Sequence, residues 1–221
     1  MRIGGLKQRI GADSKVGCVL GIDFKKVGQG HGQSFMSHDV YGHICAITGA
    51  VWNLDGRKFD GADDYIRIPD SSPLSPATIT VEAKAKLYGK ATYGMIVSKR
   101  DSAGTIMPYE LIFHQTNDRW HFQVKGEAWY TASDIISPQL GTWYHVVGVM
   151  DGANVIIYRD RVKTVGTALT ALPTNTANVA IGRAGDVNDH YFNGTIRNAR
   201  ICNFSDYTAR ILARSIDSRR N

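Results

Sequence analysis

Two segments, FDGADDYIRIPDSSPLS (residues 59–75) and LGTWYHVVGVMDGANVIIYRDRV (residues 140–162), give the clearest indication of how the chain folds. In the first, a turn rich in Gly and Asp precedes the alternating segment 65–68, which Pro69 ends. In the second, two runs rich in β-branched and aromatic residues flank Asp151-Gly152, a dipeptide typical of tight hairpin turns. Both segments therefore predict antiparallel β-structure.

The segment ATITVEAKAKL (residues 77–87) alternates between apolar and polar residues without a break. Such alternation predicts a strand with one face in the core and the other in water. A buried strand is predicted earlier, at residues 17–24, and further strand-like segments follow at residues 94–100, 109–115, 119–126, 178–183 and 194–204. They predict an all-β antiparallel sandwich. Only residues 205–216 have the spacing of apolar residues that predicts a helix.

The composition is typical of one soluble globular domain, with 221 residues, 43% of them hydrophobic and 21% charged. No apolar run is long enough to predict a membrane span, and the first residues lack the apolar core of a secretory signal peptide. The three cysteines are Cys18, Cys45 and Cys202. Their odd number and wide spacing predict buried free thiols rather than disulfides or a zinc site, in keeping with a reducing compartment.

Much of the net charge of +6 lies near the two ends of the chain. Near the start, Arg2, Lys7 and Arg9 are interpreted either as solvated residues or as part of a basic arm that grips an acidic partner surface. No basic stripe interleaved with aromatic residues occurs mid-chain, so we expect no nucleic-acid partner. The predicted organisation is a basic arm (1–15), one domain (16–216) and a basic tail (217–221).

In this order, residues 59–75, 140–162 and VAIGRAGDVNDHYFNGTIRNARICNFSDYTARIL (179–212) resemble the LamG-like jelly roll of the concanavalin A-like lectin and glucanase superfamily. The resemblance implies a two-sheet antiparallel jelly-roll sandwich with one short C-terminal helix. Asp160-Arg161 stands where the family usually has Asp-Gly, which alters a turn. The fold hosts lectins, enzymes, adhesion modules and structural parts, so it does not by itself define a function.

Many relatives hold a structural calcium ion, which the resemblance raises as an alternative here. This chain has Arg197 and Asn198 where the family tends to have an acidic pair, and that exchange removes the negative charge that a hard cation needs. Asp60, Asp63 and Asp64 remain as oxygen donors. We interpret them as caps of an Asx turn and expect no cofactor and no metal.

The glucanases of the superfamily carry two glutamates at close spacing on one strand, as the acid/base and the nucleophile. The three glutamates of this chain, Glu82, Glu110 and Glu127, are far apart in the sequence. We therefore expect no catalysis, and we expect Glu82 to pair across strands.

The seven histidines do not follow the spacing of metal ligands. Three of them share a Gly-rich loop (His31, His38 and His43), and three lie on predicted strands (His114, His121 and His145). The second three are expected to line one sheet face or to take part in cross-strand packing.

Sugar binding calls for flat aromatic side chains with amide or carboxylate neighbours. The candidates are Trp129, Tyr130 and Trp120, near Asn117, Asp118 and Gln123, with His190 and Tyr191 as a second group. A place in the core is the other interpretation of Trp120. For Trp143 the core is expected, because it opens the apolar run of the predicted hairpin.

With its free cysteines, its basic ends and its lack of a leader, the chain resembles the free-standing LamG-like proteins of tailed bacteriophages. The resemblance implies a non-catalytic virion component, such as a capsid decoration protein or a tail or fibre adhesin, assembled in the host cytoplasm. It would be a homo-oligomer that docks on a virion protein such as the major capsid protein and binds cell-surface glycans. The alternatives are a carbohydrate-binding lectin and a polysaccharide-degrading enzyme.

Overall fold

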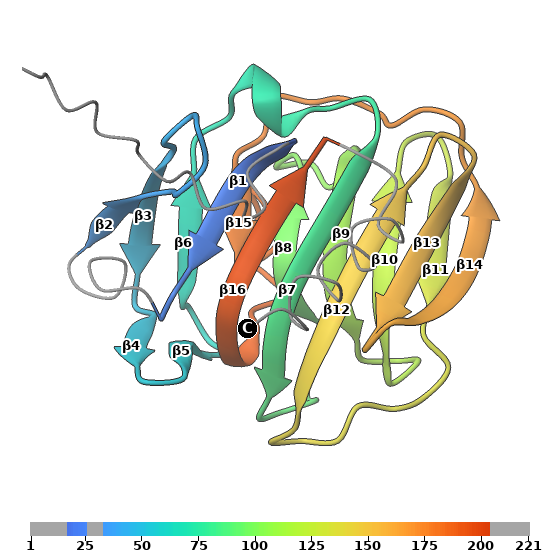
Figure 1. Ribbon diagram of the computed structural model, residues 1–221. Helices are drawn as coiled ribbons and strands as arrows, with labels where there is room; N and C mark the ends of the chain where they lie inside the picture. Colours follow the sequence, from blue (N-terminus) through green and yellow to red (C-terminus); the bar gives the residue numbers. More distant parts are fainter. Residues whose placement is uncertain (1–16, 26–32, 204–221) are drawn as a thin grey trace, which may run out of the picture.

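The computed structural model describes residues 17–25 and 33–203, which form an antiparallel sandwich of two sheets (Figure 1). Sheet A contains β1 (Cys18–Asp23), β4 (Val51–Asn53), β5 (Gly56–Asp60), β7 (Ile79–Leu87), β12 (Trp143–Met150), β13 (Asn154–Arg159), β14 (Val162–Ala168) and β16 (Asn193–Cys202). Sheet B contains β2 (Ser34–Met36), β3 (Ile44–Thr48), β6 (Tyr65–Ile68), β8 (Gly94–Lys99), β9 (Met107–His114), β10 (Arg119–Lys125), β11 (Trp129–Ser133) and β15 (Val179–Ile181).

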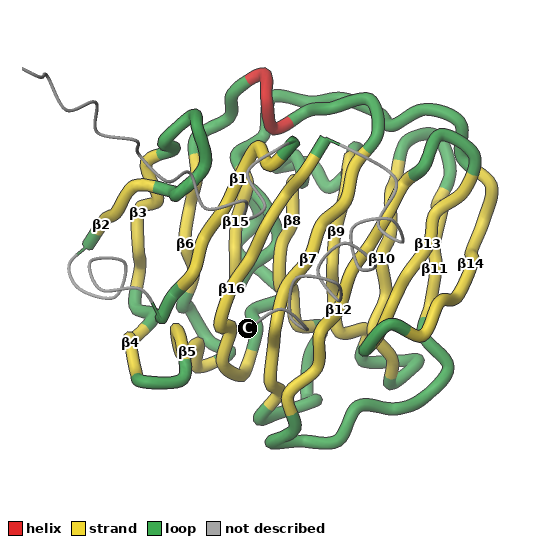
Figure 2. Tube along the Cα trace, viewed as in Figure 1, coloured by secondary structure: helices red, strands yellow, loops and turns green. Residues whose placement is uncertain are grey.

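The strand order in sheet A is β14-β13-β12-β7-β16-β5-β4, with β1 paired to β16, and in sheet B it is β11-β10-β9-β8-β15-β6-β3-β2. Within residues 17–25 and 33–203, the only helical element is the 3₁₀ turn η1 (Ser72–Leu74) (Figure 2). The expected all-β jelly-roll sandwich is confirmed. The predicted helix at 205–216, the arm at 1–15 with Arg2, Lys7 and Arg9, and the tail at 217–221 lie outside the described residues.

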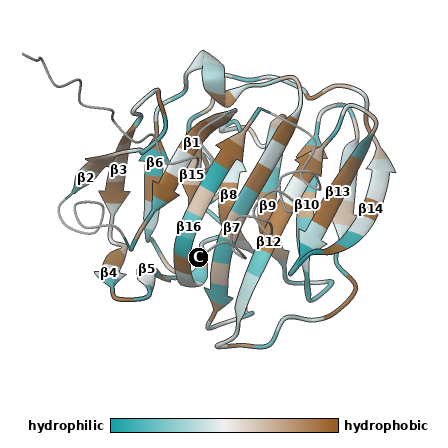
Figure 3. Ribbon diagram, viewed as in Figure 1, coloured by the Kyte–Doolittle hydropathy of each residue, from teal (hydrophilic) through white to brown (hydrophobic). Residues whose placement is uncertain are grey.

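Strand β7 lies at the centre of sheet A, between β12 and β16. Its odd-numbered apolar side chains are fully buried in the core between the sheets, as the alternation predicts (Ile79, Val81, Ala83, Ala85 and Leu87). Figure 3 shows bands of hydrophobic and hydrophilic residues along β7 and β16. The core is therefore built from the period of two that the sequence displays.

The polar face of β7 differs from expectation, because Thr80 and Glu82 are only 0% and 2% exposed rather than in water. Arg200 of β16 lies opposite Glu82 in the sheet and donates a hydrogen bond from Nη1 to Glu82 Oε1 at 2.9 Å. The expected cross-strand pairing of Glu82 is thus present, in a site that is shielded from water.

Two hairpin turns have the backbone geometry that their sequences require. Gly152, between β12 and β13, has φ of 89°, and Asp160 and Arg161, after β13, have φ of 48° and 77°. In the second turn φ is positive at both central residues, Asp160 and Arg161, which is the geometry of a type I′ turn. The Asp160 carboxylate also accepts a hydrogen bond from His145 N at 2.9 Å. The chain thus adopts this turn with Asp160 and Arg161 in place of Asp-Gly.

The three cysteines are free and buried, which confirms the sequence expectation. Burial raises the pKa of Cys45 to about 12. Across the described ranges, no helix is long and apolar enough to cross a bilayer.

We expect Val81→Asp to abolish soluble folding, because an unpaired buried carboxylate costs several kcal/mol, against a typical domain stability of about 5–15 kcal/mol. Soluble yield and thermal melting check this result. Lys163→Asp, at an exposed position of edge strand β14, is the control and should fold like the wild type. A soluble Val81→Asp protein with an unchanged melting temperature would contradict the assignment of β7 to the core.

Candidate functional site

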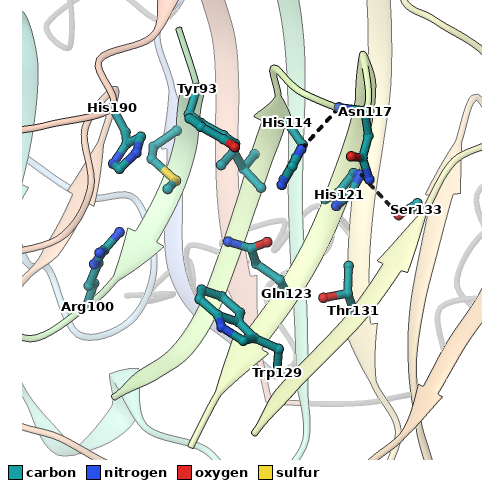
Figure 4. Close-up of a pocket in the computed structure, with 12 residues that line it drawn as sticks. Tyr93, Arg100, His114, Asn117, His121, Gln123, Trp129, Thr131, Ser133 and His190 are labelled. Carbon is teal, nitrogen blue, oxygen red and sulfur yellow. Dashed lines mark hydrogen bonds between the residues drawn. The ribbon is translucent and has the colours of Figure 1, made fainter. Parts of the chain in front are cut away.

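A cleft of about 690 Å³ lies on the outer face of sheet B, across β8, β9, β10 and β11 (Figure 4). Alternate residues of these strands line it, since the residues between them point into the core. In β10, for example, His121 and Gln123 line the cleft, whereas Trp120 and Phe122 belong to the core. The period of two in sheet B therefore selects which side chains reach the cleft.

Trp129 is the exposed aromatic residue of the cleft, with 51% of its surface accessible. It lies opposite Lys125 in the pairing of β11 with β10, and the Lys125 ammonium is 5.1 Å from the centre of the Trp129 ring. Lys125 also donates a hydrogen bond to Gly104 O at 3.0 Å. The cation–π contact and this bond hold the indole at the edge of the cleft while much of its surface remains open.

His114 and His121 stack in the cleft, with ring centres 4.4 Å apart and planes 15° from parallel. They are diagonal neighbours on β9 and β10, a spacing within reach of ring side chains. His121 Nε2 lies 3.0 Å from Ser133 Oγ. Burial, with the nearby charges of His114 and Arg119, lowers the pKa of His121 to about 4, and burial also lowers the pKa of His114. Both imidazoles are therefore neutral at physiological pH.

Gln123 is held by a buried polar network beneath the cleft. Its Nε2 donates to Glu110 Oε2 at 2.8 Å, and Ser98 Oγ donates to Glu110 Oε1 at 2.8 Å. Ser98 Oγ in turn accepts a hydrogen bond from Gly185 N at 3.1 Å. Glu110 is fully buried, and this burial raises its pKa. Because the amide nitrogen of Gln123 is committed to Glu110, the amide keeps one orientation.

Tyr93 and His190 form a second wall of the cleft. The Tyr93 ring meets His114 edge to face at 4.7 Å and His190 at 5.1 Å. The Tyr93 hydroxyl lies 2.8 Å from Thr116 Oγ1, which fixes the ring in place. Sequence reasoning did not select Tyr93, because it precedes β8 and nothing in its local pattern links it to His114 on β9.

The structure brings together two of the expected ligand residues, Trp129 and His190, and places both at the cleft with Asn117 and Gln123. Whether they bind a ligand stays a prediction. Trp120 is fully buried in the core, as the second of its two interpretations expects, and therefore does not line the cleft.

The other two candidates lie away from the cleft. Tyr130 is partly buried and packs against the core, because it alternates with Trp129 and Thr131 along β11. Tyr191 is half-buried and does not line the cleft, although His190 beside it does.

Trp143 is also placed differently from expectation. It lies opposite Lys86 in the pairing of β12 with β7, and it faces outward from sheet A rather than into the core. The Lys86 ammonium is 4.8 Å and the Arg197 guanidinium 4.4 Å from its ring. Two cations thus cover this indole.

The glutamates do not meet in one site. Glu82 lies on sheet A and Glu110 on sheet B, each on the face that points away from the core, and Glu127 follows β10. His145 lies 3.9 Å from Glu82. It is therefore on the other sheet from His114 and His121, and the three strand histidines do not share a face.

Among the described residues, one group of potential metal ligands was found, the carboxylates of Asp60, Asp63 and Asp64, whose ligand atoms lie within 4.8 Å of one another. Asp60 Oδ1 accepts hydrogen bonds from Ala62 N and Asp63 N at 2.8 and 3.3 Å, and Asp64 Oδ2 accepts one from Asp60 N at 2.9 Å. The Asp60 and Asp64 carboxylates thus make capping bonds of the kind that the sequence predicts, in the turn before β6. His31, of the Gly-rich loop, lies outside the described residues.

Comparison with known proteins gives one family match. The model for the concanavalin A-like lectin/glucanases superfamily matches residues 60–205, more than half of the chain. A search of curated protein sequences gave no significant match.

Solved structures show the same fold. Trypanosoma rangeli sialidase in complex with sialic acid aligns with a TM-score of 0.67 at 18% identity, over 89% of this chain and 32% of that one. The botulinum neurotoxin serotype D binding domain aligns with a TM-score of 0.66 at 11% identity, over 86% and 48%. This chain thus spans about a third of the sialidase and about half of the toxin structure, and at such identities the likeness concerns the fold alone.

The lowered pKa of His121 predicts a loss of stability in acid. The pKa of His121 is about 4 in the folded protein, against an ordinary value of 6.5. As the pH falls from 6.5 towards 4, the unfolded chain therefore binds the proton before the folded protein does, and this favours unfolding. We expect the free energy of unfolding to fall more steeply in the wild type than in His121→Asn, measured by urea unfolding at about pH 7 and about pH 4.5.

Comparing the two proteins isolates His121. Burial raises the pKa of Asp134 to about 6 and also raises that of Glu110, so both groups act in the opposite direction but contribute equally to wild type and variant. An identical loss of stability in the two proteins would show that His121 is not a buried neutral imidazole.

Proposed function

Because the chain belongs to the concanavalin A-like lectin/glucanases superfamily, we propose that it is a non-catalytic binding module whose carbohydrate ligand occupies the cleft on the outer face of sheet B. The observation that carries this proposal is the exposed Trp129 at the edge of the cleft. A sugar ring has an apolar C–H face that packs on a flat aromatic ring, and a rim of hydroxyl groups that needs hydrogen-bond partners.

The remaining lining supplies those partners. Gln123 and Asn117 provide amides, Thr131 and Ser133 provide hydroxyls, and His121 provides a neutral imidazole. Each such group both donates and accepts hydrogen bonds, as sugar hydroxyls do. The Gln123 amide is already oriented by Glu110, and a side chain fixed in advance loses less conformational entropy when a ligand binds.

A binding role without catalysis is supported by the carboxylates. None of the residues that line the cleft is Asp or Glu. The carboxylate beneath it, Glu110, is fully buried and hydrogen-bonded to Ser98 and Gln123. Most families of glycosidases use two carboxylic groups on either side of the scissile bond, about 5–10 Å apart. The described cleft offers no such pair.

The similar structures add support of a general kind. Trypanosoma rangeli sialidase, which contains this fold, has been solved with sialic acid bound, so a sugar ligand does occur in a protein with a domain of this shape.

The virion setting is part of the proposal and rests on other observations. The free, buried thiols fit folding in a reducing compartment, and basic residues near the start of the chain suit an acidic docking surface. If residues 1–15 dock the protein on a particle, their deletion should abolish particle binding in a sedimentation assay and leave thermal melting unchanged. Full decoration by the truncated protein would contradict the docking role of the arm.

We expect Trp129→Ala to weaken glycan binding at least about tenfold, a loss of about 1.4 kcal/mol, because it removes the aromatic surface on which the sugar packs. A glycan array identifies ligands, and calorimetry measures the affinities of both proteins. Trp129→Phe should retain part of the affinity.

Tyr41→Ala is the matched control, since Tyr41 is 52% exposed but lies in the β2–β3 connection, at the other end of sheet B. Unchanged affinity in Trp129→Ala, or an equal loss in Tyr41→Ala, would refute the assignment of the cleft as the binding site.

A further inference from the structure

Arg100 is a cation in the cleft with no ion pair to any described residue. It directly follows β8, and Figure 4 shows its guanidinium directed into the cleft on the same side as His190. Its Nε is buried without a hydrogen-bond partner. The adjacent Asp101 does not neutralise it by contact, because the Asp101 carboxylate accepts hydrogen bonds from Thr105 and Ile106.

The surroundings of Arg100 leave a positive charge in the cleft. The lining includes no carboxylate. Glu110 lies beneath it, hydrogen-bonded to Ser98 and Gln123, and interacts electrostatically with Arg100 and Lys125 without forming an ion pair by contact with either. Lys125 adds a second positive charge beside Trp129. At the rim, the Asp189 carboxylate lies 3.3 Å from His190 Nδ1 and so is engaged outside the lining. An anionic group that entered the cleft would therefore meet cations that have no carboxylate partner in contact.

From this arrangement we propose that the cleft binds an acidic sugar, a uronic or nonulosonic acid, whose carboxylate pairs with Arg100 while its ring packs on Trp129. The planar guanidinium presents paired N–H donors that match the two oxygens of a carboxylate. The partly desolvated cleft strengthens such a charge-assisted pair relative to one in open water. This inference rests on the proposed carbohydrate-binding function and names its ligand class.

Two matched ligand pairs test the inference by calorimetry with the full-length protein. The first is tetragalacturonate and its methyl ester, which keeps the rings and removes the charge. The second is sialyllactose and lactose. The wild type should bind the acidic member of at least one pair about tenfold or more tightly than its neutral counterpart, and added salt should reduce only that preference.

Variants at Arg100 locate the effect. Arg100→Gln should bring affinity for the acidic ligand down to about that for the neutral ligand, because it removes the cation that pairs with the carboxylate. Arg100→Lys keeps the charge without the planar fork and should retain part of the preference. Thermal melting verifies that each variant folds. If Arg100→Gln does not fold, Arg100→Lys replaces it as the variant whose preference for the acidic ligand is compared with that of the wild type.

The outcomes separate this inference from the function on which it rests. Equal affinity of the wild type for acidic and neutral members, or a preference that survives in Arg100→Gln, overturns the acidic ligand and leaves carbohydrate binding standing. If no member of either pair binds and a broad glycan array is also negative, the carbohydrate function itself fails, and the acidic ligand fails with it.

Discussion

Side chains alternate between the two faces of a β-strand, and both the core and the cleft depend on that alternation in sheet B. The core side of β10 packs tightly, since a Cβ placed on Gly148 of β12 would come within 2.0 Å of the Phe122 ring. A shift of β10 by one residue would bring His121 and Gln123 into the core and expose Phe122. The packing of the core therefore fixes the composition of the cleft.

Polar groups under the cleft make its surface rigid. A buried carboxylate such as Glu110 is costly to desolvate unless partners satisfy its oxygens, and Ser98 and Gln123 do so. The same bonds orient the Gln123 amide toward the cleft. Stacking of His114 on His121 has a comparable effect, because it keeps two neutral imidazoles in fixed positions. The contacts that stabilise this sheet thus also fix the side chains that line the cleft.

Much of the sandwich could be predicted from local patterns, whereas the site depended on pairing between strands. The alternation of β7 and the Asp151-Gly152 turn are visible in the sequence. Strand β11 was not recognised, since its short polar segment becomes a strand only through pairing with β10. The tryptophans show the same division: the alternation of residues 119–125 is visible in the sequence and puts Trp120 in the core, whereas pairing with Lys86 turns Trp143 outward. Residue patterns do not contain that register.

The four tryptophans allow one direct measurement of where a ligand binds. Their indole N–H signals in a nitrogen-15 NMR spectrum report on different places: Trp129 in the cleft, Trp120 in the core, Trp143 on the outer face of sheet A and Trp52 bonded to Phe24 O. On titration with glycans that bind, the account predicts that the Trp129 signal shifts and the other three stay in place. A shift of Trp143 or Trp52 with Trp129 unmoved would place the binding surface elsewhere and contradict it.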